Sequence, residues 1–561
     1  MNQTRVFLIF AWLAVATLLW MEWGKERAAV GNTPATSAAA LATQTPVGSV
    51  PSAGDGTPTV PNAPGMVAAA APVKPVASDP VVTVATDVLR IEMTGGEIRQ
   101  ADLMGFPSEA AEGSAPVRLL DQAAGRYFVA QSGWAGNSAA PSHEAGFRPV
   151  GDARRFTLAE GAQSVQVPFE WTGAGGVTIR RTYTFTRGEY AVTVRDEVVN
   201  AGSQPWEGYV YRQLRREPRA LSRGGPMNAE QYSYQGAAWY SAAEKYEKRD
   251  FEDIADDGPL NRQVTGGWIA MLQHHFFAGW IPQSDQASLF VLEHGAGQFE
   301  IESRGPAFNV APGATAATEA RLWVGPKLVK QIEAQGVPGL ERAVDFSSYS
   351  IFATLGSWLF WLLDAIHSLV GNWGWAIIGL VVVIKLLLLP LSTAQYKSMA
   401  RMRKFQPRMA QLKERYGDDR QKFQQAMMDL YKKEKINPVG GCLPLLVQMP
   451  VFLALYWVLL ESVELRHAPW ILWINDLTAR DPYFVLPAIN MAVMWAGQKL
   501  APMSGMDPMQ QKMMQFMPLV FGVMFAFFPA GLVLYWITNA GIGLAQQWYM
   551  TRKYADNAAR A

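Results

Sequence analysis

The alternation of apolar and polar residues divides the chain into two halves. From 81 to 345 the pattern has period two, and glycine or proline separates the runs. The segment GGVTIRRTYTFTRGEYAVTVRDEVV predicts two strands joined at Arg187 and Gly188, and Gly95 and Gly96 mark another turn. Many short strands of this kind are typical of a large two-sheet β-sandwich. We therefore predict an all-β domain over residues 81–345.

From residue 346 onward, long uncharged runs replace the alternation. Residues 346–370 are apolar and aromatic but carry Asp364 and His367, which predicts an amphipathic helix lying at a membrane interface. The region 371–550 then holds apolar runs that predict short transmembrane helices, at 375–391, 442–460, 483–500, 513–528 and 532–549. Because several of these runs fall short of about 20 residues, we expect the bilayer around them to be thinned.

The N-terminus adds a sixth predicted span. Arg5 precedes an apolar run, and no small residues follow that run closely enough for a signal-peptide cleavage site. This favours an uncleaved anchor over residues 1–24 rather than a cleaved signal peptide. Residues 25–80 are rich in Ala, Pro, Gly, Ser and Thr, and we expect a disordered linker there because they offer little apolar surface to bury.

Basic residues predict the orientation. The segment 392–438 has twelve basic and five acidic residues, which places it in the cytoplasm, whereas the acidic segment 461–481 lies outside. The loop 501–512 and the tail 551–561 are then cytoplasmic, and so are both termini, with the β domain across the membrane. Gly417 to Asp419 break the helical pattern of 392–438, which predicts a cytoplasmic helical hairpin.

The composition excludes several classes of function. Cys442 is the sole cysteine, so no intrachain disulfide or thiol-rich metal site can form. The six histidines are scattered, and the adjacent His274 and His275 would point to opposite faces of a strand. No phosphate-binding loop, zinc-protease motif or nucleophile elbow is present. We therefore expect no catalytic residue, no metal and no cofactor.

Lys385 is the most unusual residue, because it lies inside the apolar run GLVVVIKLLLLPLS. One interpretation is that its stem reaches the headgroups from near the helix end at Pro390. The other is that it faces a water-filled groove, since a lysine at the bilayer centre costs about 2.5–3.5 kcal/mol. Polar residues of other spans could line such a groove or instead bond between helices; they are Gln448, Asn490, Gln498, Thr538 and Asn539.

Methionine is the second unusual feature. Its flexible side chain suits surfaces that accept varied apolar partners, although ordinary packing is the alternative interpretation. Several methionines lie in the segments predicted to be cytoplasmic, and we regard them as candidates for capturing apolar chains: Met399, Met402, Met409, Met427, Met428, Met503, Met506 and Met509.

The C-terminal half resembles a known family. The segments HSLVGNWGWAII, NPVGGCLPLLVQMPVFLALYWVL, DPMQQKMMQFMP and FPAGLVLYW are similar to those of the YidC/Oxa/Albino family of membrane protein insertases. The anchor, linker and β domain are similar to its Gram-negative form, which has a large periplasmic supersandwich. The resemblance implies a five-helix core around a hydrophilic groove, in a multi-pass protein of the bacterial inner membrane.

The resemblance also implies roles for individual residues. Lys385 falls where family members commonly have an arginine. It therefore supplies the positive charge but not the planar guanidinium group that can bind a carboxylate at two points. Tyr535 and Trp536 fall near an aromatic residue that contacts substrates, and Val381 replaces a polar residue. We add Met449 and Phe452 as candidate substrate contacts. The implied activity is insertion and chaperoning of nascent membrane proteins, alone or with the Sec translocon.

The remaining expectations concern partners and rival functions. The lipid bilayer is an implied partner, the ribosome and the signal recognition particle pathway are further candidates, and no specific nucleic-acid recognition is expected. A transporter or channel would favour internal repeats, which we do not find. A membrane-anchored periplasmic carbohydrate-binding protein would place its chemistry in 81–345, where no convincing pair of acidic residues stands out.

Overall fold

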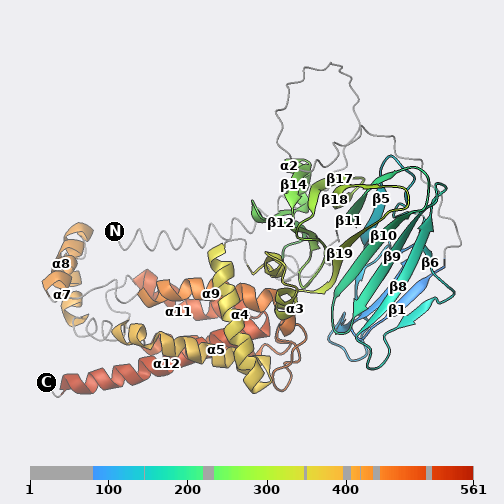
Figure 1. Cartoon of the computed structure of the whole chain (residues 1–561). Helices are drawn as coiled ribbons and strands as arrows, with labels where there is room; N and C mark the ends of the chain where they lie inside the picture. Colours follow the sequence, from blue (N-terminus) through green and yellow to red (C-terminus); the bar gives the residue numbers. More distant parts are fainter. Residues whose placement is uncertain are drawn as a thin grey trace, which may run out of the picture. The chain divides into compact units, whose positions relative to one another are not determined.

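A computed structural model describes residues 80–144, 146–218, 233–346, 350–395, 406–416, 419–433, 443–500 and 508–559 of the chain (Figure 1). The predicted anchor 1–24 and nearly all of the predicted linker 25–80 lie outside the described residues. The description below therefore covers the β domain and the helices that follow it.

The β domain contains three sheets. The first has the order β4 (Pro116–Leu120), β3 (Glu97–Pro107), β2 (Leu89–Thr94), β1 (Val82–Ala85), β7 (Arg155–Thr157). The second has the order β13 (Lys245–Asp250), β12 (Gly236–Ser241), β15 (Trp268–Leu272), β16 (Phe276–Pro282), β19 (Thr315–Pro326), β10 (Ala191–Asn200), β9 (Val177–Thr186), β8 (Ser164–Thr172), β6 (Arg148–Pro149). The third has the order β14 (Leu260–Thr265), β17 (Ala287–Gly295), β18 (Gln298–Val310), β11 (Trp206–Arg216), β5 (Phe128–Ala135).

The alternating pattern gives these strands their buried and exposed faces. In β9, valine, isoleucine, tyrosine and phenylalanine are buried at every second position, and β10 pairs with β9 in antiparallel register. The predicted turns at Arg187–Gly188 and Gly95–Gly96 lie between β9 and β10 and between β2 and β3. The prediction of a β-sandwich is confirmed, but the prediction of two sheets is wrong, because β1–β4 and β7 form a third. Alternation fixes which face of a strand is buried and not which strands pair.

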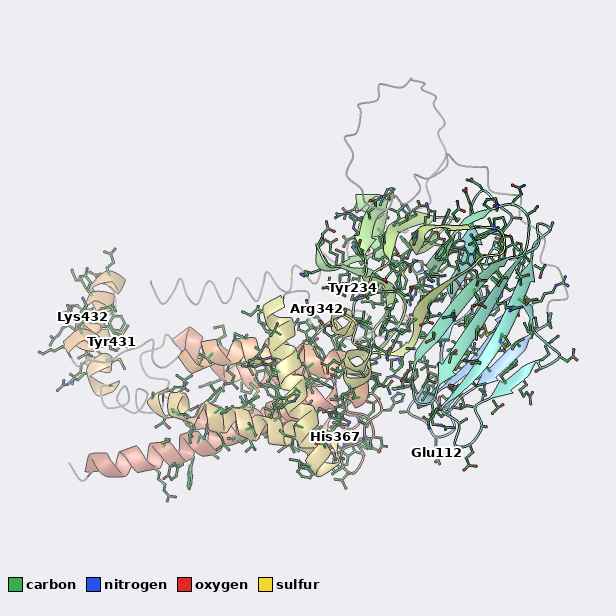
Figure 2. All side chains as sticks on the ribbon, in the orientation of Figure 1. Glu112, Tyr234, Arg342, His367, Tyr431 and Lys432 are labelled. Carbon is green, nitrogen blue, oxygen red and sulfur yellow. The ribbon has the colours of Figure 1, made fainter. Side chains whose placement is uncertain are left out.

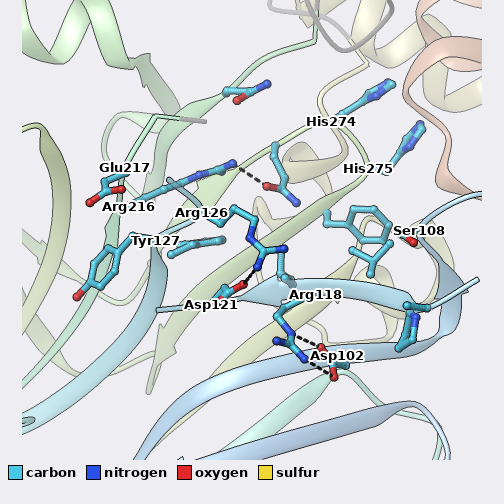
Figure 3. Close-up of a pocket in the computed structure, with 18 of the residues that line it drawn as sticks. Asp102, Ser108, Arg118, Asp121, Arg126, Tyr127, Arg216, Glu217, His274 and His275 are labelled. Carbon is cyan, nitrogen blue, oxygen red and sulfur yellow. Dashed lines mark hydrogen bonds and ion pairs between the residues drawn. The ribbon is translucent and has the colours of Figure 1, made fainter. Parts of the chain in front are cut away.

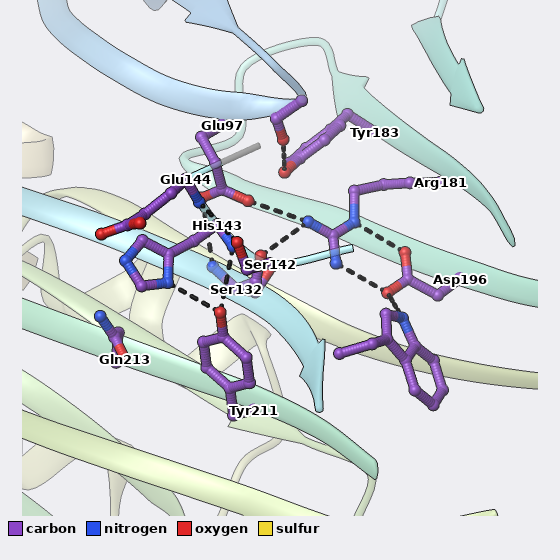
Figure 4. A network of polar contacts seen from close by, with 12 residues as sticks. Glu97, Ser132, Ser142, His143, Glu144, Arg181, Tyr183, Asp196, Tyr211 and Gln213 are labelled. Atoms are coloured by element: carbon purple, nitrogen blue, oxygen red, sulfur yellow. Dashed lines mark hydrogen bonds and ion pairs between the residues drawn. The ribbon is translucent and has the colours of Figure 1, made fainter. Parts of the chain in front are cut away.

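Arg181 joins the three sheets at the centre of the domain (Figure 4). Its fully buried guanidinium donates to both carboxylate oxygens of Asp196 on β10 at 2.8 Å, and to Glu97 on β3 at 3.0 Å. It also donates to the carbonyl of Ser132 on β5 at 3.0 Å. A buried guanidinium is tolerated because these oxygens replace its water. The network thus connects one strand from each sheet to β9.

The helices follow the β domain in the chain. Three short elements lie within or just after the sheets: α2 (Phe251–Asp257), α3 (Val329–Ala334) and the 3₁₀ turn η2 (Leu340–Val344). The later helices are α4 (Ser350–Val370), α5 (Trp373–Leu387), α7 (Gln406–Tyr416), α8 (Arg420–Lys433), α9 (Leu443–Glu461), the 3₁₀ turn η4 (Val463–Leu465), α10 (Val485–Leu500), α11 (Pro508–Phe525) and α12 (Ala530–Ala559). From residue 373 onward, α5, α9, α10, α11 and α12 overlap the predicted apolar runs, and α7 and α8 lie within the segment 392–438.

The helix that carries Lys385 ends earlier than the apolar run suggests. α5 stops at Leu387, and a second helical segment, Leu389–Gln395, continues at an angle of 63°. Pro390 explains the break, because proline has no amide hydrogen to bond to the Leu386 carbonyl and its ring crowds that carbonyl. Lys385 thus lies in the last turn of α5, next to a bend.

By length and composition, one described helix, Ile351–Val370, could cross a membrane, or two if α5 and the segment after its bend count as one span. Val447–Glu461 and Lys512–Phe525 are shorter apolar helices. α4 packs against α5 and α9, α12 packs against α5 and α10, and α10 packs against α11. Figure 1 shows α4 lying across the direction of α5 and α9 rather than along it.

Candidate functional site

One face of α12 carries the residues that meet α5 and α9. Tyr535, Asn539 and Gly543 are four residues apart, so they lie above one another on the helix. Gln448 on α9 donates a hydrogen bond to the side-chain oxygen of Asn539 at 2.6 Å. One turn below, the Nζ atom of Lys385 lies 3.9 Å from the place that a Cβ atom would take on Gly543. The structure therefore brings Lys385, Gln448 and Asn539 to one region between three helices.

Lys385 has unusual surroundings. Its side chain is partly buried, and among the described residues no ion pair to it is found. An added Cβ atom on Gly543 would make only ordinary van der Waals contact with the ammonium group, so the lysine head lies close to this turn of α12. The arrangement places one positive charge beside α12, one turn from the Gln448–Asn539 pair.

The other predicted groove residues lie elsewhere or bond locally. Asn490 is fully buried on α10, where its amide contacts the sulfur of Met494 at 3.8 Å. Gln498 donates to the carbonyl of Met514 on α11. Thr538 donates to the carbonyl of Leu534 in its own helix at 2.8 Å. These contacts match the alternative interpretation, in which such residues bond within or between helices.

Aromatic residues cover the region on the other side of Asn539. The Phe452 ring lies 4.8 Å from the Trp536 ring and 6.2 Å from the Tyr535 ring, measured between centroids. Met449, one turn away on α9, is 41% exposed and is available to an apolar partner. Val381 is buried in the helix core. A role for Val381 in contacting substrates therefore needs a rearrangement of α5.

The predicted capture residues are described only in part. Met409 on α7 is buried and accepts a hydrogen bond from the Tyr431 hydroxyl of α8 at 3.7 Å, so it packs within the hairpin. Figure 2 labels Tyr431 and Lys432 on this hairpin. Met427 is half-buried, and Met428 is 54% exposed. Met399, Met402, Met503 and Met506 lie outside the described residues, as does the side chain of Met509.

Sequence reasoning missed how the C-terminal end of α9 is held by the β domain. The turn between β15 and β16 carries His274 and His275, whose rings stack 3.7 Å apart and whose Nε2 atoms both lie within 3.2 Å of the Leu460 carbonyl. The expectation that they point to opposite faces is wrong, because they lie in a turn and not in a strand. Burial lowers the pKa of His274 to about 4, so the ring is neutral at pH 7 and its N–H can donate.

A second contact lies next to this carbonyl. Lys327, just after β19, is fully buried with its Nζ 3.9 Å from a carboxylate oxygen of Glu461, the last residue of α9. In addition, Glu464 accepts a hydrogen bond from the amide of Val329 at 3.2 Å. In the sequence, neither the adjacent histidines nor Lys327 indicates a contact with α9. Only the folded structure shows that they lie beside Leu460 and Glu461.

Fold and site together define a membrane protein whose helical core holds a lysine among polar side chains, with a β-sandwich attached to the C-terminal end of α9. Comparisons with known proteins agree. A family model described as 60Kd inner membrane protein matches residues 365–557, and one described as YidC periplasmic domain matches residues 81–362.

Curated relatives match over the whole chain. The membrane protein insertases YidC of Stenotrophomonas maltophilia strain R551-3 and Xanthomonas euvesicatoria are 59% and 57% identical to it, with 98% and 99% of their own lengths covered. A solved structure of an active YidC insertase aligns with 84% of this chain and 95% of that chain at 20% identity, with a TM-score of 0.36. The chain belongs to the YidC family of membrane protein insertases. Proteins of this family lie in the bacterial inner membrane and have a periplasmic domain, which is the β-sandwich here.

Proposed function

We propose that this insertase receives the polar segment of a nascent membrane protein in a groove between α5, α9 and α12. The observation that carries the proposal is the position of Lys385, which lies against Gly543 one helical turn from the Gln448–Asn539 pair. Three polar side chains on three different helices give a polar segment something to contact inside the membrane. The apolar segment that follows then leaves between the helices into lipid, driven by burial in hydrocarbon.

The charge of Lys385 sets a preference among client proteins. A cation in hydrocarbon is costly unless water or an anion reaches it. No ion pair to Lys385 is found among the described residues, so we infer that water hydrates the ammonium group at rest. An acidic translocated segment is attracted to it, and the attraction is strong where the surroundings have a low dielectric constant. Because positive charge is sufficient for this role, we expect an arginine at position 385 to function as well as the lysine.

The proposal includes a topology. We place 1–24 as an anchor, 25–80 as a linker, 81–345 in the periplasm and 371–550 as a membrane core of five helices, with both termini in the cytoplasm. We place α4 at the interface, because it crosses α9 near the outer end of that helix: an added Cβ atom on Gly356 would lie 3.3 Å from Val458. A charged residue of α4, Asp364, also pairs with Lys330 of α3 at 2.8 Å.

The cytoplasmic parts complete the mechanism. We assign capture of the emerging apolar segment to the hairpin 392–438 and the loop 501–512, with the exposed Met428 as a contact. The aromatic residues Phe452, Tyr535 and Trp536 then form the face along which the segment passes. Sec translocon, ribosome and the signal recognition particle are partners in this proposal, because the capture site faces the side where the chain is synthesised.

The test is reconstitution of purified protein in proteoliposomes, with insertion of a client that has an acidic translocated segment. We expect Lys385→Ala to reduce insertion about five- to tenfold, as the loss of a charge contact of about 1 kcal/mol or more predicts, and Lys385→Arg to retain it. Lys499→Ala is the matched control, because Lys499 ends α10 over the Trp495 ring and away from the groove. Normal insertion by Lys385→Ala would overturn the proposal.

A further inference from the structure

A second site lies in the β domain, next to the attachment of α9 (Figure 3). It is a cavity of about 660 Å³, within the range of about 300–1,000 Å³ that is usual for ligand pockets. Its walls come from β4, from the turn before β5, and from the turn between β15 and β16. Arg466, in the loop that follows α9, completes the wall. The cavity therefore adjoins both the periplasmic domain and the outer side of the helical core.

The wall carries an excess of positive charge. Five arginines and three carboxylates line it, and the nearby His274 is neutral at pH 7 because burial lowers its pKa to about 4. Each carboxylate is already engaged within the wall: Asp102 by Arg118 at 2.8 Å, Asp121 by Arg126 at 3.3 Å. The third, Glu217, accepts from a backbone amide and from a glutamine side chain. The cavity thus favours an anionic ligand.

The wall also offers an unpaired strand edge. β4 is the last strand of the first sheet, and among the described strands it pairs with β3 alone. Five consecutive residues, 115–119, line the cavity. Because side chains alternate in direction along a strand, a consecutive run in the wall means that the backbone edge faces the cavity. Such an edge accepts an extended peptide as an additional strand.

The position of the cavity suggests where the peptide comes from. Arg466 lies in the loop that follows the C-terminal end of α9. Its guanidinium donates to the carbonyls of Pro107, the last residue of β3, at 2.7 Å and of Ser108, the next residue, at 3.1 Å. The same loop leads on to α10, so the cavity lies where a segment that has crossed the membrane emerges. A free strand edge beside arginines distinguishes such a segment from a phosphate group, which would use the arginines alone.

We propose that this cavity binds an acidic, extended segment of a client protein after that segment has crossed the membrane. This inference rests on the proposed function, because insertion through the groove is what would deliver the segment to the cavity. The arginines attract the carboxylates, and the edge of β4 pairs with the backbone of the segment. Binding on the outer side would keep a translocated segment from returning through the groove.

Binding can be measured without insertion. The probe is a labelled peptide of alternating Asp and Val, titrated onto the full-length protein in nanodiscs by fluorescence anisotropy. We expect Arg126→Glu to weaken binding about fivefold, since it places a negative charge at the cavity wall. Arg180→Glu is the matched control, because Arg180 and Arg126 are 60% and 59% exposed and each is paired with one carboxylate, Glu170 and Asp121. Arg90→Glu, at an exposed residue of the cavity wall, is a second variant in case Arg126→Glu does not fold.

Three further probes distinguish the ligand. A peptide with alternate amides methylated should bind more weakly, because it cannot pair with β4, and a Lys–Val peptide should not bind. Glycerol phosphate in excess should displace little of the labelled peptide. If glycerol phosphate displaced the labelled peptide as fully as unlabelled peptide does, the site would be assigned to phosphate headgroups and the proposal would be overturned. Equal loss from Arg126→Glu and Arg180→Glu would overturn it as well. Because Lys385→Ala should leave peptide binding unchanged, failure here is separable from failure of the groove.

Discussion

Gln448 on α9 donates a hydrogen bond to the side chain of Asn539 on α12 at 2.6 Å, and this bond lies one helical turn from the glycine that Lys385 contacts. Hydrogen bonds between membrane helices contribute about 0.6 kcal/mol on average, so the pair does little for stability. The main effect of the Gln448–Asn539 pair is that it makes the region between α5, α9 and α12 polar.

Asn539→Leu should therefore leave the fold intact but reduce insertion of clients with a polar translocated segment. We expect a reduction of about two- to threefold, which corresponds to the loss of roughly one such hydrogen bond. Insertion into proteoliposomes measures it. Thr538→Val is the control, because the Thr538 hydroxyl bonds within its own helix. Equal effects of the two substitutions would contradict a special role for Asn539.

Arg181→Met should destabilise the β domain strongly. The substitution leaves Glu97 and Asp196 buried without their cation, and breaking a buried pair in this way costs about 3–5 kcal/mol. Thermal unfolding followed by tryptophan fluorescence should show the loss. Arg180→Met, next in sequence but 60% exposed, should cost under about 1 kcal/mol. A similar shift for both variants would show that the network does not hold the sheets.

The attachment of α9 should weaken in acid. Burial lowers the pKa of His274 from its ordinary value of 6.5 to about 4, so the unfolded state binds the proton more tightly. The contribution of His274 to the free energy of unfolding is fully present above pH 6.5, and it is lost as the pH falls from 6.5 towards 4. At pH 5 the loss reaches up to about 2 kcal/mol. The double variant H274Q/H275Q keeps donors for the Leu460 carbonyl and should lose less stability between pH 7 and pH 5.

Gly374→Ala should disturb the N-terminal end of α5. An added Cβ atom would lie 2.1 Å from a ring carbon of Trp470, a separation that forces the indole to move. We expect a cost of about 1–3 kcal/mol in unfolding free energy, typical of overpacking. Gly497→Ala on α10 meets nothing within 4 Å and should instead stabilise its helix by up to about 1 kcal/mol. Opposite signs for the two variants are the expected result in thermal unfolding.

Local features of this fold could be predicted from the sequence. Strands β9 and β10 and the helices α7 and α8 follow from apolar periods of two and of about 3.6, and the turn between β9 and β10 follows from Gly188. The number of sheets could not be predicted, because β1 pairs with β2 and β7 through backbone atoms that every residue has. The burial of Arg181 could not be predicted for a related reason. The sequence of β9 contains the arginine, but its carboxylate partners, Glu97 and Asp196, lie on other strands.

The candidate site shows the same limit. Lys385, Gln448 and Asn539 stand out in the sequence because each is polar within an apolar run. Asn490, Gln498 and Thr538 stand out equally, yet the structure gives them local or α10–α11 partners. Which polar residues share one region depends on how each helix is rotated about its axis, and apolar surroundings on every side leave that rotation unspecified in the sequence.

The two histidines at the Leu460 carbonyl constrain how the proposed groove could open. A shift of α9 along its axis by one turn, about 5.4 Å, would break both of those hydrogen bonds and separate Glu461 from Lys327. Sliding of α9 is therefore costly, whereas rotation of α5 and α12 against it breaks none of these contacts. The β domain thus fixes the height of one wall of the proposed groove, and opening of that groove would come from α5 and α12.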